Sequence, residues 1–111
     1  MKIVSLDSIP EITTSHNKAG KKKVFIENNL IPHITQYARI VFDPSEIVEE
    51  HSHSDMYEIM YVEEGAGIFK IDGIEHAVKK GDCVTIEPNE KHEVRVTGEN
   101  PLVLFVTGIR V

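Results

Sequence analysis

The stretch EEHSHSDMYEIMYVEEG, residues 49–65, decides the fold and contains most of the candidate ligands. His51 and His53 are two residues apart, so on a β-strand both imidazoles project from one face. Glu58 follows His53 at an odd spacing of five and joins the pair only if the chain turns between them. Ser54 and Asp55 favour such a turn. The stretch therefore predicts two strands joined by a polar turn, with three potential metal ligands on one side.

Beyond this turn the residues alternate between the two faces of a strand. One face carries Met56, Glu58, Met60 and Val62, and the other carries Tyr57, Ile59 and Tyr61. Because both faces are largely apolar, we expect both to be covered, the second by another sheet or by a partner subunit.

The rest of the chain has short segments rich in β-branched and aromatic residues, separated by Gly, Pro, Asn and Asp about every ten residues. This spacing is typical of an all-β sandwich or barrel with little helix. The clearest turn is Asp72-Gly73, which predicts a type I′ hairpin. We expect strands at 24–26, 34–42, 47–51, 56–62, 67–71, 74–78, 83–86, 91–96 and 102–109.

The chain length of 111 residues fits a single domain. We divide it into an N-terminal arm with a Lys-rich loop, residues 1–23, and a barrel, residues 24–111. Lys18 to Lys23 form a local basic cluster. Its main interpretation is a solvated loop, and the alternative is a site for an anionic substrate or for the acidic edge of a partner.

A second stretch, GDCVTIEPNEKH at residues 81–92, ends on His92. His92 shares strand parity with Val94 and Val96, so its imidazole is expected on the apolar, inward side. A buried imidazole needs hydrogen bonds or a metal to offset its loss of hydration. Three imidazoles and one carboxylate near strand ends therefore favour a metal site over separate core histidines.

These two stretches resemble the two sequence motifs of the cupin family. The first motif is matched by His51, His53, Glu58 and Gly65, and the second by Gly81, Pro88 and His92. The chain departs from the motifs at four positions, Ser45 for Gly, Glu87 for Pro (with Pro88 one residue later), Asn89 for Gly and Val96 for Asn. Asn89 can adopt the left-handed conformation that Gly would supply. None of the four changes affects an expected ligand.

The resemblance implies a double-stranded β-helix, the jelly-roll barrel of cupins, with a metal near its mouth held by His51, His53, Glu58 and His92. It also implies a homodimer. Imidazole and carboxylate donors without a thiolate suit Fe, Mn, Zn, Ni, Co or Cu as the divalent ion, and do not choose among them. Four ligands leave coordination positions for water or substrate, which is typical of a catalytic or ligand-binding site.

Composition limits the partners. Twelve Lys and Arg against 18 Asp and Glu give a net charge of −6, which argues against binding to nucleic acid or to an anionic membrane. The one cysteine, Cys83, forms no internal disulfide, and no apolar run is long enough for a signal peptide or a membrane span. We therefore expect a cytoplasmic protein whose partner is a small molecule.

Other reactive residues are interpreted as structural. Cys83 is expected to be a small buried hydrophobic residue, while His16, His33 and His76 are expected at the surface. Glu49 lies either on the solvated rim of the barrel or beside a ligand.

Two classes of function stay open. The first is a metalloenzyme that acts on a small organic molecule, as an oxygenase or another oxidoreductase in preference to an isomerase or decarboxylase. The second is a non-catalytic module that binds or senses a metabolite. Acid and base groups at the mouth besides the ligands would favour the enzyme, and a purely apolar lining would favour binding. The catalytic residues are unknown at this level.

Overall fold

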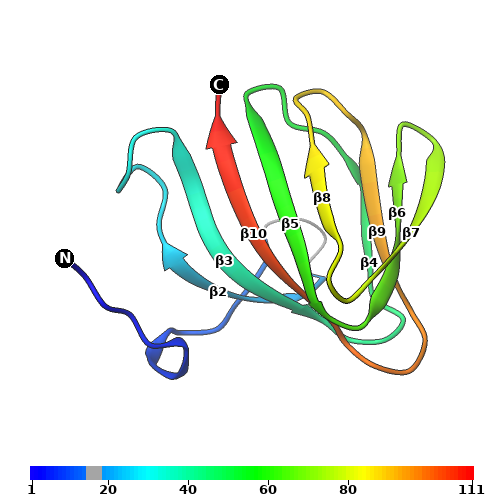
Figure 1. The fold of residues 1–111 in the computed structure, drawn as a ribbon, viewed down its shortest axis with the longest axis horizontal. Helices are drawn as coiled ribbons and strands as arrows, with labels where there is room; N and C mark the ends of the chain where they lie inside the picture. The colour runs from blue at the N-terminus through cyan, green and yellow to red at the C-terminus, as the bar shows by residue number, and fades with distance from the viewer. Residues whose placement is uncertain (15–18) are drawn as a thin grey trace.

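Two antiparallel β-sheets face each other in the computed structural model, which describes residues 1–14 and 19–111 (Figure 1). The larger sheet has the order β1-β2-β3-β10-β5-β8, and the smaller has the order β4-β9-β6-β7. Elements of the larger sheet are β1 (Ile12–Thr13), β2 (Lys21–Ile26), β3 (Ile34–Phe42), β10 (Leu102–Arg110), β5 (Met56–Glu64) and β8 (Cys83–Ile86). Those of the smaller sheet are β4 (Ile47–His51), β9 (His92–Thr97), β6 (Ala66–Ile71) and β7 (Ile74–Lys79). This is the predicted jelly-roll, with one short 3₁₀ turn, η1 (Leu6–Ser8), among the described residues.

The predicted hairpin is confirmed. Ile71 of β6 pairs directly with Ile74 of β7, and the two turn residues between them have positive φ angles of 47° at Asp72 and 84° at Gly73. Two positive φ angles define the type I′ turn that matches the twist of the flanking strands.

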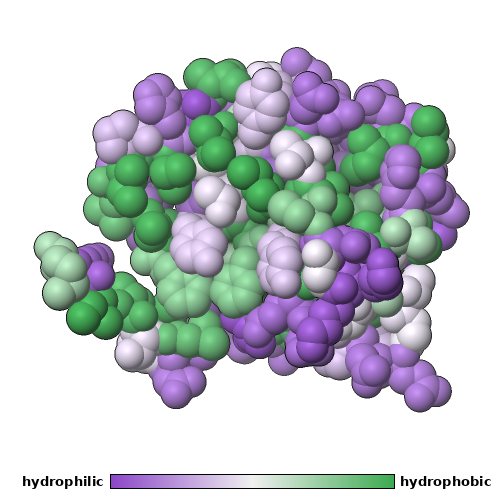
Figure 2. All heavy atoms as spheres, in the orientation of Figure 1, coloured by the Kyte–Doolittle hydropathy of each residue, from purple (hydrophilic) through white to green (hydrophobic). Residues whose placement is uncertain are grey.

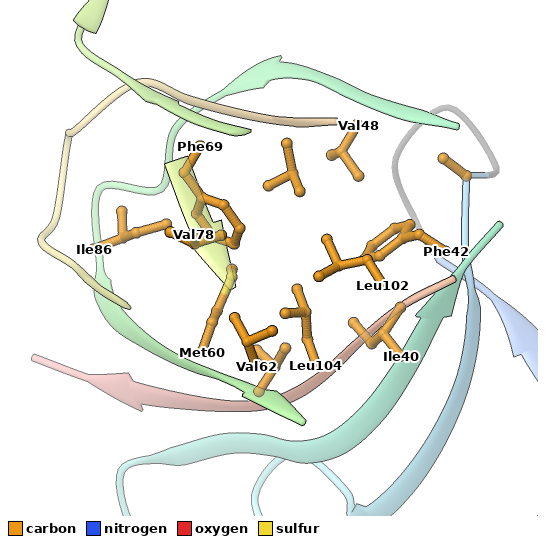
Figure 3. Packing of buried hydrophobic residues seen from close by; sticks show 13 residues of the cluster. Ile40, Phe42, Val48, Met60, Val62, Phe69, Val78, Ile86, Leu102 and Leu104 are labelled. Carbon is orange, nitrogen blue, oxygen red and sulfur yellow. The ribbon is translucent and has the colours of Figure 1, made fainter. Parts of the chain in front are cut away.

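The core lies between the two sheets, because each strand turns one apolar face inward (Figure 3). Phe69 comes from the smaller sheet, and Val62, Leu104 and Val106 come from the larger sheet. All four are at most 1% exposed, and burying each such side chain stabilises the fold by roughly 1.5–3 kcal/mol. Several residues of this core, among them Leu104 and Val106, also line a cavity between the sheets.

The Lys-rich segment is not a solvated loop where the structure describes it. Lys21, Lys22 and Lys23 form the first half of β2 and pair with Val41, Ile40 and Arg39 of β3. The strand predicted at 24–26 thus begins three residues earlier, because β3 provides hydrogen-bond partners for this backbone. Long lysine stems can also lie along apolar surface. Lys18 and His16, by contrast, lie outside the described residues.

One further expectation was wrong. Cys83 is exposed, because it begins β8, the edge strand of the larger sheet, on its outer face. The described part of the chain places no second sheet over the outer face of β5, where Tyr61 is 45% and Tyr57 36% exposed, so its cover by a partner subunit stays a prediction. Among the described residues no helix has the length needed to cross a membrane.

Candidate metal centre

Four side chains converge at one end of the barrel: His51, His53, Glu58 and His92. One potential ligand atom from each lies within 4.8 Å of all the others, and we call this set the ligand cluster. His51 ends β4, His53 lies in the turn that follows, Glu58 belongs to β5 and His92 begins β9. All four line one cavity. The structure thus brings together every residue that the sequence predicted as a ligand.

The centre of the ligand cluster contains two buried polar atoms without a hydrogen-bond partner among the described residues: Oε1 of Glu58 and Nε2 of His92. They lie 3.3 Å apart, and Nε2 of His53 is 3.4 Å from the same carboxylate oxygen. Leaving such atoms unsatisfied costs about 1–3 kcal/mol each. A metal ion bound between them would remove this cost, so the residues present fit a metal.

Backbone carbonyls orient two of the imidazoles. Nδ1 of His92 lies 2.9 Å from the carbonyl oxygen of Glu90, and Nδ1 of His51 lies 2.8 Å from that of Glu49. A carbonyl only accepts, so Nδ1 carries the proton and donates it in each pair. Each ring therefore has the lone pair of its neutral form on Nε2, and this arrangement is typical of metal-binding histidines.

Local irregularities in the strands bring the ligands onto one side. The pairing of β4 with β9 shifts between Val48 and His51, so a bulge turns both of these side chains inward. After His53 the chain bends at residues 54–55, as predicted. The side chain of Glu58 on β5 then points into the space between the two sheets, where it is buried. The amide of Asn89 donates to the carbonyl oxygen of His53 over 2.7 Å, which fixes the turn that carries this ligand.

Asn89 has a φ of 70°, so it adopts the left-handed conformation expected for a residue in place of Gly. Ser45, the other residue in place of Gly, has a φ of 74°.

Electrostatics couple Glu58 and His92. Burial raises the pKa of Glu58, but the approach of His92 and the charges of the neighbouring imidazoles outweigh it, so this pKa lies below its ordinary value. Burial lowers the pKa of His92, whereas contact with Glu58 and the bond to the Glu90 carbonyl raise it above the ordinary value. Both shifts favour positive charge next to the carboxylate, which is the charge that a metal cation would bring.

The ligand cluster opens into a cavity of about 130 Å³. Most of its remaining lining is apolar, contributed by Ile40, Phe42, Val48, Met56, Met60, Val94, Leu104 and Val106. Three polar side chains complete the wall: Thr14, Lys22 and Gln36. Such a pocket fits a small organic molecule whose polar groups face the ligand cluster and these three residues.

Three other polar residues considered in the sequence analysis lie at the surface. The side chains of Glu49, His33 and His76 are exposed, which places Glu49 on the rim and confirms the surface assignment of both histidines. Glu49 orients His51 through its backbone carbonyl, and a sequence pattern cannot reveal such a contact.

Lys22 and Gln36 were not identified from the sequence as residues of the cavity wall. Lys22 shares strand parity with Val24, and extending the predicted strand to Lys21 would have pointed to it.

Comparison with known proteins agrees with the fold and the motifs. The sequence model of the cupin domain matches residues 38–108. The chain belongs to the cupin family. Both stretches that resemble the cupin motifs, residues 49–65 and 81–92, lie within the matched range.

Among curated relatives, the oxalate-binding protein of Thermotoga maritima is 32% identical over 66 residues, which cover 60% of this chain and 54% of that protein. An uncharacterized protein of Methanocaldococcus jannaschii is 38% identical over 55 residues, 50% of this chain and 44% of that protein. The chain spans about half the length of the curated relatives it matches.

Solved structures share the whole architecture. The structure of a predicted oxalate decarboxylase from Thermotoga maritima has a TM-score of 0.88 at 22% identity, covering 99% of this chain and 100% of that one. A cupin-superfamily sugar phosphate isomerase from Silicibacter pomeroyi has a TM-score of 0.83 at 17% identity, covering 99% and 76%. At these identities the likeness establishes the fold.

Proposed function

We propose that this cupin binds one divalent transition-metal ion through His51, His53, Glu58 and His92 and acts there on a small organic molecule, as an oxygenase or another oxidoreductase. The observation that carries the proposal is the buried pair of unsatisfied atoms, Oε1 of Glu58 and Nε2 of His92, at the wall of a cavity. A structural role alone would not need four converging donors beside an open cavity.

The donor set supports this chemistry. Three neutral imidazoles and one carboxylate suit Fe, Mn, Co, Ni, Zn or Cu. When bound, such an ion supplies a Lewis acid for a substrate oxygen, and a redox-active ion such as Fe or Mn also permits reactions with O₂. The chain itself supplies an apolar wall that limits water, and the carbonyls of Glu49 and Glu90 hold two of the imidazoles, those of His51 and His92, in one tautomer.

The second candidate is a non-catalytic module that binds a metabolite at the metal. Apart from the ligand cluster, the cavity has one titratable lining residue in the described chain, Lys22, so the wall offers little acid-base machinery. The relative named for oxalate binding adds support for this candidate. A metal-dependent isomerase is a third alternative.

The metal content of protein purified without added metal or chelator tests the shared part of both candidates. Elemental mass spectrometry should find close to one transition-metal ion per chain, and His92→Ala should abolish it. His76→Ala removes an exposed imidazole on β7 and is the matched control, which should keep the metal. A folded wild-type protein that takes up no ion on titration would overturn the proposal.

Turnover separates the enzyme from the binding module. The metal-loaded protein is incubated aerobically with a panel of small organic acids and sugars, while O₂ uptake and products are followed. Conversion that is lost in His53→Ala supports the enzyme. Tight binding without conversion supports the binding module, and full conversion by His53→Ala would contradict a role for the metal site.

We further propose that two copies associate through the outer face of the larger sheet, where Figure 2 shows apolar side chains gathered. Phe25, Tyr37 and Phe105 stack there with ring centroids 5.4–6.3 Å apart, next to the exposed Tyr61. Sedimentation should give a dimer, and Tyr61→Glu should give a monomer. A monomeric wild type would contradict this.

We place the protein in the cytoplasm, with a small molecule as its partner. The net charge of −6 opposes binding to nucleic acid or to an anionic membrane, and a single cysteine suits a reducing compartment. Fractionation of the source cells tests the location.

A further inference from the structure

Lys22 brings a positive charge into the wall of the metal cavity. It is half-buried on β2, and its Nζ atom donates a hydrogen bond to Oε1 of Gln36 over 3.0 Å. Both residues line the same cavity as the ligand cluster. An ammonium group has three N–H donors, so the bond to Gln36 fixes its position and leaves donors for a ligand.

The register of the larger sheet places Gln36 and Glu58 in one row. Gln36 of β3 pairs with Gly108 of β10, and Gly108 pairs with Glu58 of β5. Neighbouring strands are about 4.8 Å apart, so the backbones at Gln36 and Glu58 are separated by roughly 10 Å. The residue between them is Gly108, and Oγ1 of Thr35 and the sulfur of Met56 lie where its side chain would stand. Gln36 and Glu58 both line the cavity on either side of this point.

The side chain of Lys22 reaches Gln36 from a position further along β2. Its backbone pairs with Ile40, which is four residues from Gln36 on β3, and its side chain extends back to the Gln36 amide. Lys21 and Lys23 have the opposite strand parity. Lys21 is exposed, and Lys23 donates to the carbonyl oxygen of Leu6 in the N-terminal arm. Of these three lysines, Lys22 is the one that lines the cavity.

The charge balance of the cavity favours an anion. Its lining residues include one ammonium group, that of Lys22, and one carboxylate, that of Glu58. A divalent ion on the ligand cluster would leave the cavity with a surplus of positive charge, inside a protein whose net charge is −6. An organic anion would neutralise that surplus.

We propose that Lys22, positioned by Gln36, is the counter-ion that selects a short dicarboxylate as the ligand of this cavity. One carboxylate faces the ligand cluster, and the other takes charge-assisted hydrogen bonds from the Lys22 ammonium group. The inference rests on the proposed function, because it takes the ligand cluster as a metal site. It goes further by naming the ligand class and the residue that recognises it.

The test is isothermal titration of metal-loaded protein with oxalate, malonate and succinate, and with the uncharged malonamide as a control ligand. Lys22→Gln removes the charge, Lys22→Arg keeps it, and Lys21→Gln removes an equal charge from an exposed position of the same strand. Metal content and the thermal unfolding curve of each variant are measured beside the titrations. This separates loss of the ligand subsite from loss of metal or of the fold.

We expect at least one dicarboxylate to bind, malonamide not to bind, and Lys22→Gln to weaken binding roughly 10- to 100-fold, the range for one hydrogen bond to a charged group. Lys22→Arg should restore most of the affinity, and Lys21→Gln should change nothing. The inference is overturned if none of the three dicarboxylates binds, or if Lys22→Gln binds as tightly as the wild type.

Failure of the proposed function gives a different result. A chain that takes up no metal would disprove the metal site, and the same titrations on that metal-free protein would still decide the role of Lys22. Dicarboxylate binding that depends on Lys22 would support the subsite there, and equal binding by the wild type and Lys22→Gln would overturn it.

Discussion

Nε2 of His92 lies 3.3 Å from Oε1 of Glu58, and neither atom has a hydrogen-bond partner among the described residues. The carboxylate extends from β5 of the larger sheet, and the imidazole from β9 of the smaller sheet. The ligand cluster therefore joins the two sheets, and a metal bound there would cross-link them. Its effects on stability, affinity and pH response follow from this geometry.

Metal binding should stabilise the fold. At a free metal concentration of 100 times Kd, the free energy of unfolding should rise by about 2.7 kcal/mol, which is roughly 10 °C in Tm for a domain of this size. Glu58→Gln should lose most of this gain, because an amide oxygen is neutral and a poorer ligand. Thermal melts with and without metal measure it. Glu99→Gln, at an exposed position, should keep the full shift.

Metal affinity should fall as the pH falls. Nδ1 of His92 donates to the Glu90 carbonyl, so an added proton binds at Nε2, the atom that faces the cluster. Proton and metal compete for that atom. Because the pKa of His92 is raised, the proton begins to displace the metal at a higher pH than it would on an ordinary histidine. Between about pH 8 and about pH 6 the apparent Kd should increase at least tenfold. Competition titrations with a chelating dye measure it, and a flat profile would contradict this model of the site.

Ser45→Gly should stabilise the protein. Ser45 has a φ of 74°, a left-handed conformation that costs an ordinary residue about 1–2 kcal/mol and glycine almost nothing. After the larger chain entropy of unfolded glycine is subtracted, we expect a gain of about 0.5–1 kcal/mol in urea unfolding. Asn89→Gly, at a φ of 70°, should gain less, because Asn tolerates this conformation better. The reverse order would show that a contact of the Ser45 side chain matters more than its backbone.

Gly108→Ala should destabilise the protein by about 1–3 kcal/mol, the usual cost of overpacking. A Cβ atom at this position would collide with Oγ1 of Thr35, which lies next to the sulfur of Met56 in the cavity wall. Thr35→Ala should relieve the collision, so the double variant should be more stable than the two single effects added together predict. Unfolding in urea measures all four proteins. Additive effects would show that the collision is relieved elsewhere.

Much of the fold could be predicted because short β-strands show their period in the sequence. The alternation in β3, β5 and β10 and the Asp72-Gly73 turn gave correct strands and a correct hairpin. The start of β2 could not be predicted in this way. Lys21, Lys22 and Lys23 are polar, and they form a strand because the edge of β3 offers backbone hydrogen bonds to whatever segment lies beside it.

Exposure was harder to predict than strand position. Cys83 was expected to be buried from its residue type, whereas its exposure depends on β8 being an edge strand of the larger sheet. The order of strands in a sheet depends on contacts between distant segments, and local patterns carry no record of it.

The sequence by itself determined the all-β class, the cupin motifs and the identity of the four residues in the ligand cluster, because strand parity and motif spacing are local properties. Only the tertiary structure decided that Lys22 and Gln36 share a cavity with Glu58, that two backbone carbonyls fix the imidazole tautomers, and that two polar atoms are buried without partners. The shared cavity depends on β2, β3, β10 and β5 lying side by side in register, and the burial of the two polar atoms depends on the two sheets facing each other. Such pairing is set by the packing of the whole chain.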